Sequence, residues 1–211
     1  MVRFVYGGSG SGKSAFAEQL VVSCGAERKY YVATMKVYDD EGRRKVARHQ
    51  KLRENKGFVT IEQPTCIGSA ARQIQQGACG ASVAGARPGD VSGADGACGE
   101  SESRPSGKCA VLLECVMNLI ANEMFTPDGI VAESDVIARV EEGLNKLFSA
   151  ADDVVVVSGN VFCDGVEYDE TTKSYMRALA AVNTFVAQKA DESFEVVAGI
   201  PLRIGSGESA A

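Results

Sequence analysis

The chain has 211 residues, of which 45% are hydrophobic and 24% charged, a balance typical of one globular domain with a sizeable core. Its formal net charge of −6 argues against general binding to nucleic acid or to an anionic membrane, because both need a positive field to attract phosphate. Seven cysteines without a CxxC pair predict reduced thiols rather than a zinc site; we expect no membrane span, no targeting segment and a cytoplasmic protein.

Continuous apolar runs alternate with helical patterns along the chain. Such runs, without polar alternation, are typical of strands that a parallel sheet buries on both faces. The strand candidates are residues 2–6, 29–35, 109–114 and 153–158, with a last strand at 195–200 that we expect to run antiparallel at an edge. The helical patterns cover residues 13–24, about 40–53, 115–123, 133–148 and about 170–190. The alternation predicts an α/β fold with a mostly parallel central sheet flanked by helices.

Residues 77–107 interrupt this alternation. Gly, Ala and Ser make up 19 of these 31 residues, and the segment contains no aromatic side chain. It therefore buries too little apolar surface to offset its ordering entropy. We expect a flexible surface insertion in a single domain of residues 1–205, followed by a tail at 206–211; a lid over a ligand is the less favoured interpretation.

The first strand candidate leads into GGSGSGKS at residues 7–14, which matches the P-loop pattern G-x-x-x-x-G-K-[ST]. Glycines let backbone N–H groups approach a phosphate closely, and the following helix directs its positive end to the same point. We expect Lys13 to reach the β and γ phosphates and Ser14 to ligate Mg²⁺. The predicted loop residues are Gly7, Gly8, Ser9, Gly10, Ser11, Gly12, Lys13 and Ser14. The motif makes the predicted fold P-loop NTPase-like; a plain Gly/Ser turn is the alternative.

A P-loop alone leaves open a kinase, a motor or regulatory ATPase, or a GTPase switch. A GTPase usually recognises guanine with an Asn-Lys-x-Asp segment. Neither NKGF at 55–58 nor NKLF at 145–148 supplies the aspartate. The sequence therefore disfavours a Ras-like switch.

A second group of candidate residues lies at 39–53, where three acidic residues precede six basic ones, an order that suits the macrodipole of a helix. The only histidine of the chain, His49, lies four residues from Lys45 and from Arg53, so a helix would place all three on one face. Spacing alone favours a solvated basic helix with an incidental histidine. The functional alternative is that the bases hold a triphosphate while an uncharged imidazole attacks phosphorus.

Further segments along the chain belong to one recognisable order. They are GGSGSGKS, YYVATM (30–35), RRKVARHQKLR (43–53), TIEQP (60–64), VLLECVMNLIANEMF (111–125), VVVVSGNV (154–161), AVNTFVAQKAD (181–191) and EVVAGIPLRI (195–204). Together they resemble the bifunctional adenosylcobinamide kinase / adenosylcobinamide-phosphate guanylyltransferase family of cobalamin biosynthesis. The resemblance spans nearly the whole chain outside the insertion, is more specific than the P-loop alone, and favours the functional interpretation of His49.

The resemblance implies two reactions. In the first, ATP or GTP phosphorylates the hydroxyl of the aminopropanol arm of adenosylcobinamide. In the second, the histidine takes GMP from GTP, expels pyrophosphate and passes the GMP to adenosylcobinamide phosphate, giving adenosylcobinamide-GDP. The resemblance also implies a homotrimer with active sites between subunits.

The resemblance further implies a set of site residues. Beyond the loop and the catalytic residues His49 and Lys13, the implied nucleotide-binding residues are Ala33, Thr34, Met35, Gln50, Lys51, Leu52, Arg53, Glu62 and Glu114. Ser14 and Glu114 would hold Mg²⁺, as P-loop proteins commonly place a carboxylate at such a strand end. The less favoured alternative for Glu114 is a polar strand terminus that caps the following helix, whereas Glu62 could equally be a solvated strand-end charge and rests mainly on the resemblance.

The chain departs from the family pattern after residue 158, where SGNVFCDGVEYDETTKSY keeps the asparagine of an Asn-Glu-Val-Gly segment but lacks its glutamate. The corrinoid contacts of this loop therefore stay open. Phe162, Tyr168 and Tyr175 are either an apolar ledge for the corrin ring or core and subunit contacts. Two alternatives to the bifunctional enzyme stand: another small-molecule P-loop kinase, and a non-catalytic nucleotide-sensing module.

Overall fold

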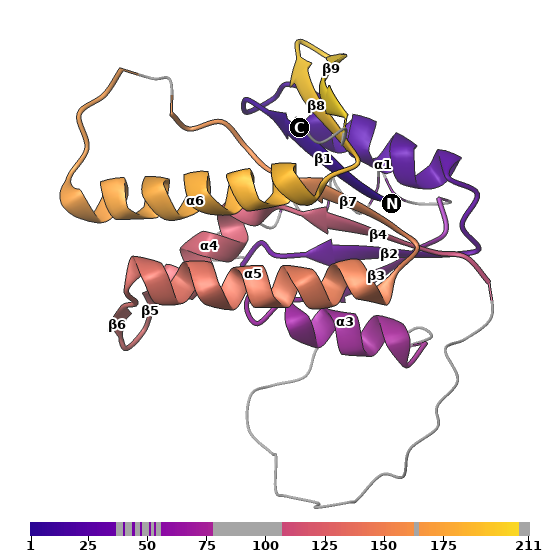
Figure 1. Cartoon of the computed structure of the whole chain (residues 1–211), viewed down its shortest axis with the longest axis horizontal. Coiled ribbons are helices and arrows are strands. Elements are labelled where there is room, and N and C mark those ends of the chain that lie inside the picture. The colour runs from indigo at the N-terminus through magenta and orange to yellow at the C-terminus, as the bar shows by residue number, and fades with distance from the viewer. Residues whose placement is uncertain are drawn as a thin grey trace, which may run out of the picture.

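A computed structural model describes residues 1–36, 40, 44, 47, 51, 53, 56–77, 107–162 and 165–206. The described part contains a seven-stranded sheet in the order β3-β2-β4-β7-β1-β8-β9 (Figure 1). Its strands are β1 (Val2–Gly7), β2 (Arg28–Ala33), β3 (Phe58–Glu62), β4 (Cys109–Glu114), β7 (Asp153–Val157), β8 (Glu192–Val197) and β9 (Ile200–Ser206). A separate two-stranded hairpin is formed by β5 (Phe125–Thr126) and β6 (Gly129–Ile130).

The first six strands of this order are parallel, and only β9 pairs antiparallel, with β8. The central strands β4 and β7 are apolar on both faces, and all five residues of β7 are buried. This is the burial that a parallel sheet covered on both faces requires. The structure therefore confirms the predicted α/β fold with a mostly parallel sheet and an antiparallel edge.

Helices cover the two faces unequally. The described helices are α1 (Lys13–Ser23), α3 (Gly68–Gln75), α4 (Val116–Met124), α5 (Glu133–Ala150) and α6 (Glu170–Lys189). The last four pack on one face, which carries the larger apolar core and lies toward the viewer in Figure 1. Helix α1 packs on the opposite face, over Val5, Leu112 and Val155. No helix in the described ranges is long and apolar enough to cross a membrane.

Helices α1, α4, α5 and α6 begin and end within two residues of their predicted bounds, whereas α3 was not predicted. Helix α6 has a side-chain cap, since Asp169 Oδ1 accepts a hydrogen bond from the Thr172 N–H at 2.7 Å, which lowers the Asp169 pKa. In the predicted helix at 40–53, the described residues are helical and the others, His49 included, lie outside the described residues. The insertion and the tail also lie largely outside them.

The predicted last strand at 195–200 needs a correction. A turn at Ala198 and Gly199, both with positive φ, divides this run between β8 and β9. Strand β8 begins three residues earlier, at Glu192, and pairs parallel with β1 on its other side. The antiparallel edge strand is therefore β9, which begins only at Ile200.

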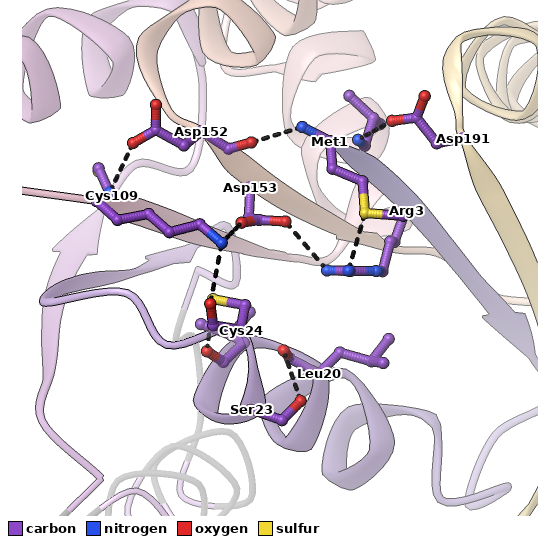
Figure 2. A network of polar contacts seen from close by, with 12 residues as sticks. Met1, Arg3, Leu20, Ser23, Cys24, Cys109, Asp152, Asp153 and Asp191 are labelled. Carbon is purple, nitrogen blue, oxygen red and sulfur yellow. Dashed lines mark hydrogen bonds and ion pairs between the residues drawn. The ribbon is translucent and has the colours of Figure 1, made fainter.

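A polar network joins the amino-terminal ends of four strands, at the edge of the sheet opposite the carboxyl ends (Figure 2). Buried Asp153 forms ion pairs with Arg3 Nη1 at 3.2 Å and with Lys108 Nζ at 2.8 Å. Arg3 also reaches Glu192 at 3.0 Å. The hydrogen bond to Asp153 raises the Lys108 pKa. This network fixes β1, and with it the start of the glycine-rich loop, between β7 and β8.

Candidate functional site

The glycine-rich loop connects β1 to α1 at the carboxyl edge of the sheet. Gly10 and Gly12 have φ angles of 71° and 91°, in the left-handed region that favours glycine. Helix α1 begins at Lys13 and has no side-chain cap at its N-terminus. Its first N–H groups are therefore available to an anion, which is the arrangement that binds phosphate in P-loops.

The turn between β8 and β9 supports the loop from one side. The Gly199 N–H donates a hydrogen bond to the Ser11 carbonyl at 2.8 Å. A Cβ on Gly12 would lie 3.2 Å from the Gly199 Cα, and one on Gly7 would lie 2.6 Å from the Val196 carbonyl oxygen. Larger side chains at these positions would displace the loop from the sheet.

Lys13 lies back across the loop, and its Nζ donates a hydrogen bond to the Gly8 carbonyl at 3.0 Å. The Lys13 side chain thus crosses the loop residues whose N–H groups would surround a phosphate. The predicted contact of Lys13 with the β and γ phosphates stays a prediction.

Ser14 and Glu114 meet beside the loop. The Ser14 hydroxyl donates a hydrogen bond to Glu114 Oε1 at 2.5 Å, while the buried Oε2 atom has no hydrogen-bond partner among the described residues. Burial raises the Glu114 pKa, against the opposing effects of the Ser14 hydrogen bond and the Lys13 charge. A hydroxyl next to an unpartnered carboxylate oxygen is a donor set that suits Mg²⁺, which typically takes one or two protein oxygens and completes its shell with water and substrate phosphate.

The strand register brings two of the predicted acids to one level of the sheet. Ala33 on β2 lies opposite Glu62 on β3 and opposite Glu114 on β4. Glu62 and Glu114 are therefore about 10 Å apart, two strand spacings, and on the same face. Glu62 is exposed, and the structure does not bring it into contact with the loop.

Thr34, just after β2, joins the ends of β2 and β4 through hydrogen bonds. The Cys115 N–H donates a hydrogen bond to Thr34 Oγ1 at 2.8 Å, and the Thr34 N–H donates to the Glu114 carbonyl at 3.0 Å. Burial raises the Cys115 pKa to about 11, so the thiol is neutral at physiological pH. The Asn122 side chain holds the following backbone by donating to the Thr34 carbonyl at 2.7 Å. Met35 comes next and is half-buried.

Arg53 lies on the same face of the sheet as α1. Its guanidinium carbon is 3.4 Å from the centroid of the Tyr31 ring, and its Nη1 atom is buried without a partner among the described residues. Burial raises the Glu114 pKa, and Arg53 is one of the cations whose charge opposes this rise. Lys51 is exposed.

Three predicted site residues, His49, Gln50 and Leu52, lie outside the described residues. Of the three aromatic residues that could form an apolar ledge, Phe162 and Tyr175 pack against the larger core, and the Tyr175 hydroxyl donates to the Met117 carbonyl at 3.3 Å, whereas Tyr168 is half-buried. These contacts support the core interpretation of Phe162 and Tyr175.

Three residues of the site were not predicted as such: Glu18, Tyr31 and Asn122. Glu18 and Tyr31 look like ordinary members of a helix and of a buried strand, and only the packing of β2 against the α1 layer brings them to the site. Asn122 gave a weak signal, because an amide within an apolar helical run, VMNLIANEM, needs a buried partner.

A depression of about 730 Å³ lies between α3 and α5, on the face opposite α1. Its lining includes Arg72, Arg139 and the Glu142–Lys146 ion pair, and none of the predicted site residues. At the carboxyl edge of the sheet, by contrast, Glu114 Oε2 and Arg53 Nη1 are buried without a hydrogen-bond partner among the described residues.

Most of the chain is similar to one family of known proteins. A family model described as "Cobinamide kinase / cobinamide phosphate guanyltransferase" matches residues 3–81 and 97–204, most of the chain. No curated protein matches the chain. Among solved structures, one described as an "ATPase Domain" superposes with a TM-score of 0.49 at 11% sequence identity, over 92% of this chain and 68% of that chain.

Proposed function

The chain belongs to the cobinamide kinase / cobinamide phosphate guanyltransferase family, and from that premise we propose that it carries out both reactions with one nucleotide site at the P-loop. The kinase reaction would phosphorylate the aminopropanol hydroxyl of adenosylcobinamide with ATP or GTP. The guanylyltransferase reaction would convert adenosylcobinamide phosphate and GTP into adenosylcobinamide-GDP and pyrophosphate. Family membership itself assigns a nucleotide-dependent transferase of cobalamin biosynthesis.

One observation carries the proposal of a shared site. Glu114 Oε2 and Arg53 Nη1 are both buried on the face of the sheet that α1 covers, and neither atom has a hydrogen-bond partner among the described residues. A buried acceptor and a buried donor left unpaired cost stability, so a ligand that satisfies both is the natural occupant. A nucleotide phosphate with its Mg²⁺ offers an acceptor to the arginine and a cation to the carboxylate.

In the kinase step, the acceptor hydroxyl oxygen would attack the γ phosphorus as the bond to the β–γ bridging oxygen breaks, releasing the nucleoside diphosphate and a proton. The loop N–H groups and Lys13 would stabilise the charge that develops on the phosphate oxygens. Lys13 needs only to exchange the Gly8 carbonyl for a phosphate oxygen. Bound Mg²⁺ would neutralise charge on the phosphates, with Ser14 and Glu114 as its protein ligands.

In the guanylyltransferase step, the uncharged imidazole of His49 would attack the α phosphorus of GTP, forming an N–P bond as pyrophosphate leaves. An oxygen of adenosylcobinamide phosphate would then attack the same phosphorus and release the imidazole. Two displacements let pyrophosphate leave before the bulky corrinoid enters. Nearby cations such as Arg53 would favour the uncharged form of the imidazole.

The remaining predicted nucleotide contacts come from the resemblance. Ala33, Thr34 and Met35 would contact the nucleotide from the end of β2, and Gln50, Lys51 and Leu52 from the segment before Arg53. Glu62, exposed at the end of β3, would approach the nucleoside rather than the phosphates, since it is two strands from Glu114.

We also propose the homotrimer that the resemblance implies. Light scattering should then give three times the chain mass of 22.2 kDa. A mass equal to one chain would contradict this part of the proposal without affecting the nucleotide chemistry.

The function is tested with the two corrinoids separately. With ATP and Mg²⁺, adenosylcobinamide should gain one phosphate, and with GTP and Mg²⁺, adenosylcobinamide phosphate should become adenosylcobinamide-GDP, both followed by liquid chromatography and mass spectrometry. Another small-molecule P-loop kinase would give neither product, and a nucleotide-sensing module would bind nucleotide without turnover.

A further inference from the structure

The Arg53 side chain packs on an aromatic ring, and no ion pair with any acid of the described residues is formed. Its guanidinium carbon lies 3.4 Å from the Tyr31 ring centroid, and the Arg53 residue is only 8% exposed. In the described part of the chain, the residue that the Arg53 guanidinium contacts is therefore an aromatic one, Tyr31. A cation over a ring face keeps its N–H groups, which point outward around the guanidinium edge, available for another acceptor.

Tyr31 is itself fixed in place. The residue is 4% exposed, and its ring meets the Phe58 ring edge-to-face, with centroids 6.3 Å apart and planes at 83°. Tyr31 lies in the middle of β2 and is paired with Thr60 on one side and Leu112 on the other. A ring set in the sheet in this way cannot move with the arginine, so it acts as a rigid support.

The chain after Arg53 is tied to the helix of the P-loop. The Lys56 N–H donates to the Arg53 carbonyl at 3.1 Å, and Lys56 Nζ pairs with Glu18 of α1 at 2.6 Å. Glu18 is 3% exposed and lies one turn after Ser14, on the same face of α1. The Arg53 side chain thus packs on the sheet, while its carbonyl is linked to the P-loop helix indirectly, through Lys56.

We propose that Tyr31 is a positioning residue, which supports the Arg53 guanidinium beside the P-loop so that its unpartnered Nη1 meets a phosphate of the bound nucleotide. This inference rests on the proposed nucleotide site. Tyr31 does not touch the nucleotide and acts only through Arg53. The ring face is the part that matters, so phenylalanine should replace tyrosine and an aliphatic side chain should not.

The test measures the affinity of the full chain for Mg²⁺ with the β,γ-imido analogue of GTP, by calorimetry. Tyr31→Leu should weaken binding about 2- to 30-fold, the range expected for loss of a cation–π contact. Tyr31→Phe should stay within about twofold of the wild type, because it keeps the ring. In an Arg53→Ala background, Tyr31→Leu should have no further effect, since the arginine it supports is absent.

The matched control is Tyr30→Leu. Tyr30 precedes Tyr31 on β2, is equally buried at 3%, and belongs to the core on the opposite face. Its replacement should lower the melting temperature as Tyr31→Leu does, without changing nucleotide affinity.

A second readout does not depend on nucleotide. In protein labelled with ¹⁵N-arginine, the Arg53 side-chain N–H resonance should be shifted upfield by the Tyr31 ring in the wild type and in Tyr31→Phe, and not in Tyr31→Leu. The proposal would be overturned if wild type and Tyr31→Leu bound the nucleotide analogue with equal affinity. It would also be overturned if Tyr31→Leu lost the same affinity in the Arg53→Ala background as in the wild type, or if the wild type showed no ring-current shift. Failure of the proposed function would look different: the corrinoid products would be missing while the affinities still followed Tyr31.

Discussion

The Ser14 hydroxyl donates a hydrogen bond to Glu114 Oε1 at 2.5 Å, joining the first turn of α1 to the end of β4 across 100 residues of sequence. The contact leaves the second carboxylate oxygen buried and unpartnered among the described residues. Stability and function therefore place opposite demands on Glu114, because the buried charge that destabilises the fold is the charge that would bind a metal ion.

The first prediction concerns Glu114→Gln. Burial raises the Glu114 pKa in the folded state, so folding disfavours an ionisation that the unfolded chain undergoes freely at neutral pH. The amide should raise the melting temperature at pH 7 and abolish Mg²⁺-dependent turnover. Differential scanning calorimetry and the corrinoid assays measure the two effects.

The pH dependence of this gain follows from the direction of the shift. Below the usual glutamate pKa, about 4.3, the carboxyl is protonated in the folded and unfolded states alike, and the substitution should change little. As pH rises through the raised pKa of the folded state, the wild type loses stability and the amide variant does not. A melting temperature that falls on substitution at pH 7, or a gain that is largest near pH 4, would show that the carboxylate is stabilised where it lies.

The second prediction concerns Lys13→Met. Within the described part of the chain, the ammonium bonds to the Gly8 carbonyl across the loop, so its loss should leave the melting temperature nearly unchanged. Loss of phosphate stabilisation should reduce both turnover rates by about 100-fold or more. Lys36→Met, a lysine just after the Ala33–Met35 stretch, is the control and should retain activity. Comparable activity of Lys13→Met and wild type would remove the P-loop from the mechanism.

The sequence predicted those parts of the fold that have a long hydrophobic pattern or a continuous motif. Helices α1, α5 and α6 have helical patterns long enough to identify, and the P-loop residues form one continuous segment. Strand β3, FVTIE, is too short to distinguish from a loop, and the run EVVAGI concealed the turn at Gly199 because its apolar residues continue through it.

The site was predictable only where its residues are local in sequence or follow a strand. Glu114 could be expected at a strand end, and its register with Ala33 and Glu62 follows from the parallel pairing of three strands. The contact of Tyr31 with Arg53 could not be predicted, because it depends on the packing of a segment 22 residues further along the chain over the middle of β2. Contacts between separate segments of this kind leave no periodic pattern in the sequence.

A third prediction concerns the network of Figure 2. Asp153 is buried between Arg3 and Lys108, so Asp153→Asn should remove two charge-assisted hydrogen bonds and lower the free energy of unfolding by about 1–3 kcal/mol, measured by urea denaturation. Glu170→Gln, in an exposed ion pair with Lys173, should leave the unfolding midpoint unchanged. Equal effects of the two substitutions would mean that the network does not fix β1.

The fourth prediction concerns the contact between α3 and α5. A Cβ on Gly143 would lie 2.4 Å from Ile67 Cγ2 and 3.1 Å from the Gly68 nitrogen. Gly143→Ala should therefore push the two helices apart and cost about 1–3 kcal/mol, despite the better helix propensity of alanine. Asn145→Ala, on the exposed side of α5, should be neutral or slightly stabilising in the same urea titration. A stabilised Gly143→Ala variant would show that α3 adapts without cost.

The central claim, covalent transfer of GMP by His49 at the P-loop site, is tested most directly with GTP labelled at the α phosphorus. The wild-type chain should carry one acid-labile, base-stable GMP. His49→Ala should carry none and should still phosphorylate adenosylcobinamide with ATP. An unlabelled wild type that nevertheless forms adenosylcobinamide-GDP, or a His49→Ala variant that still takes the label, would contradict covalent transfer by His49.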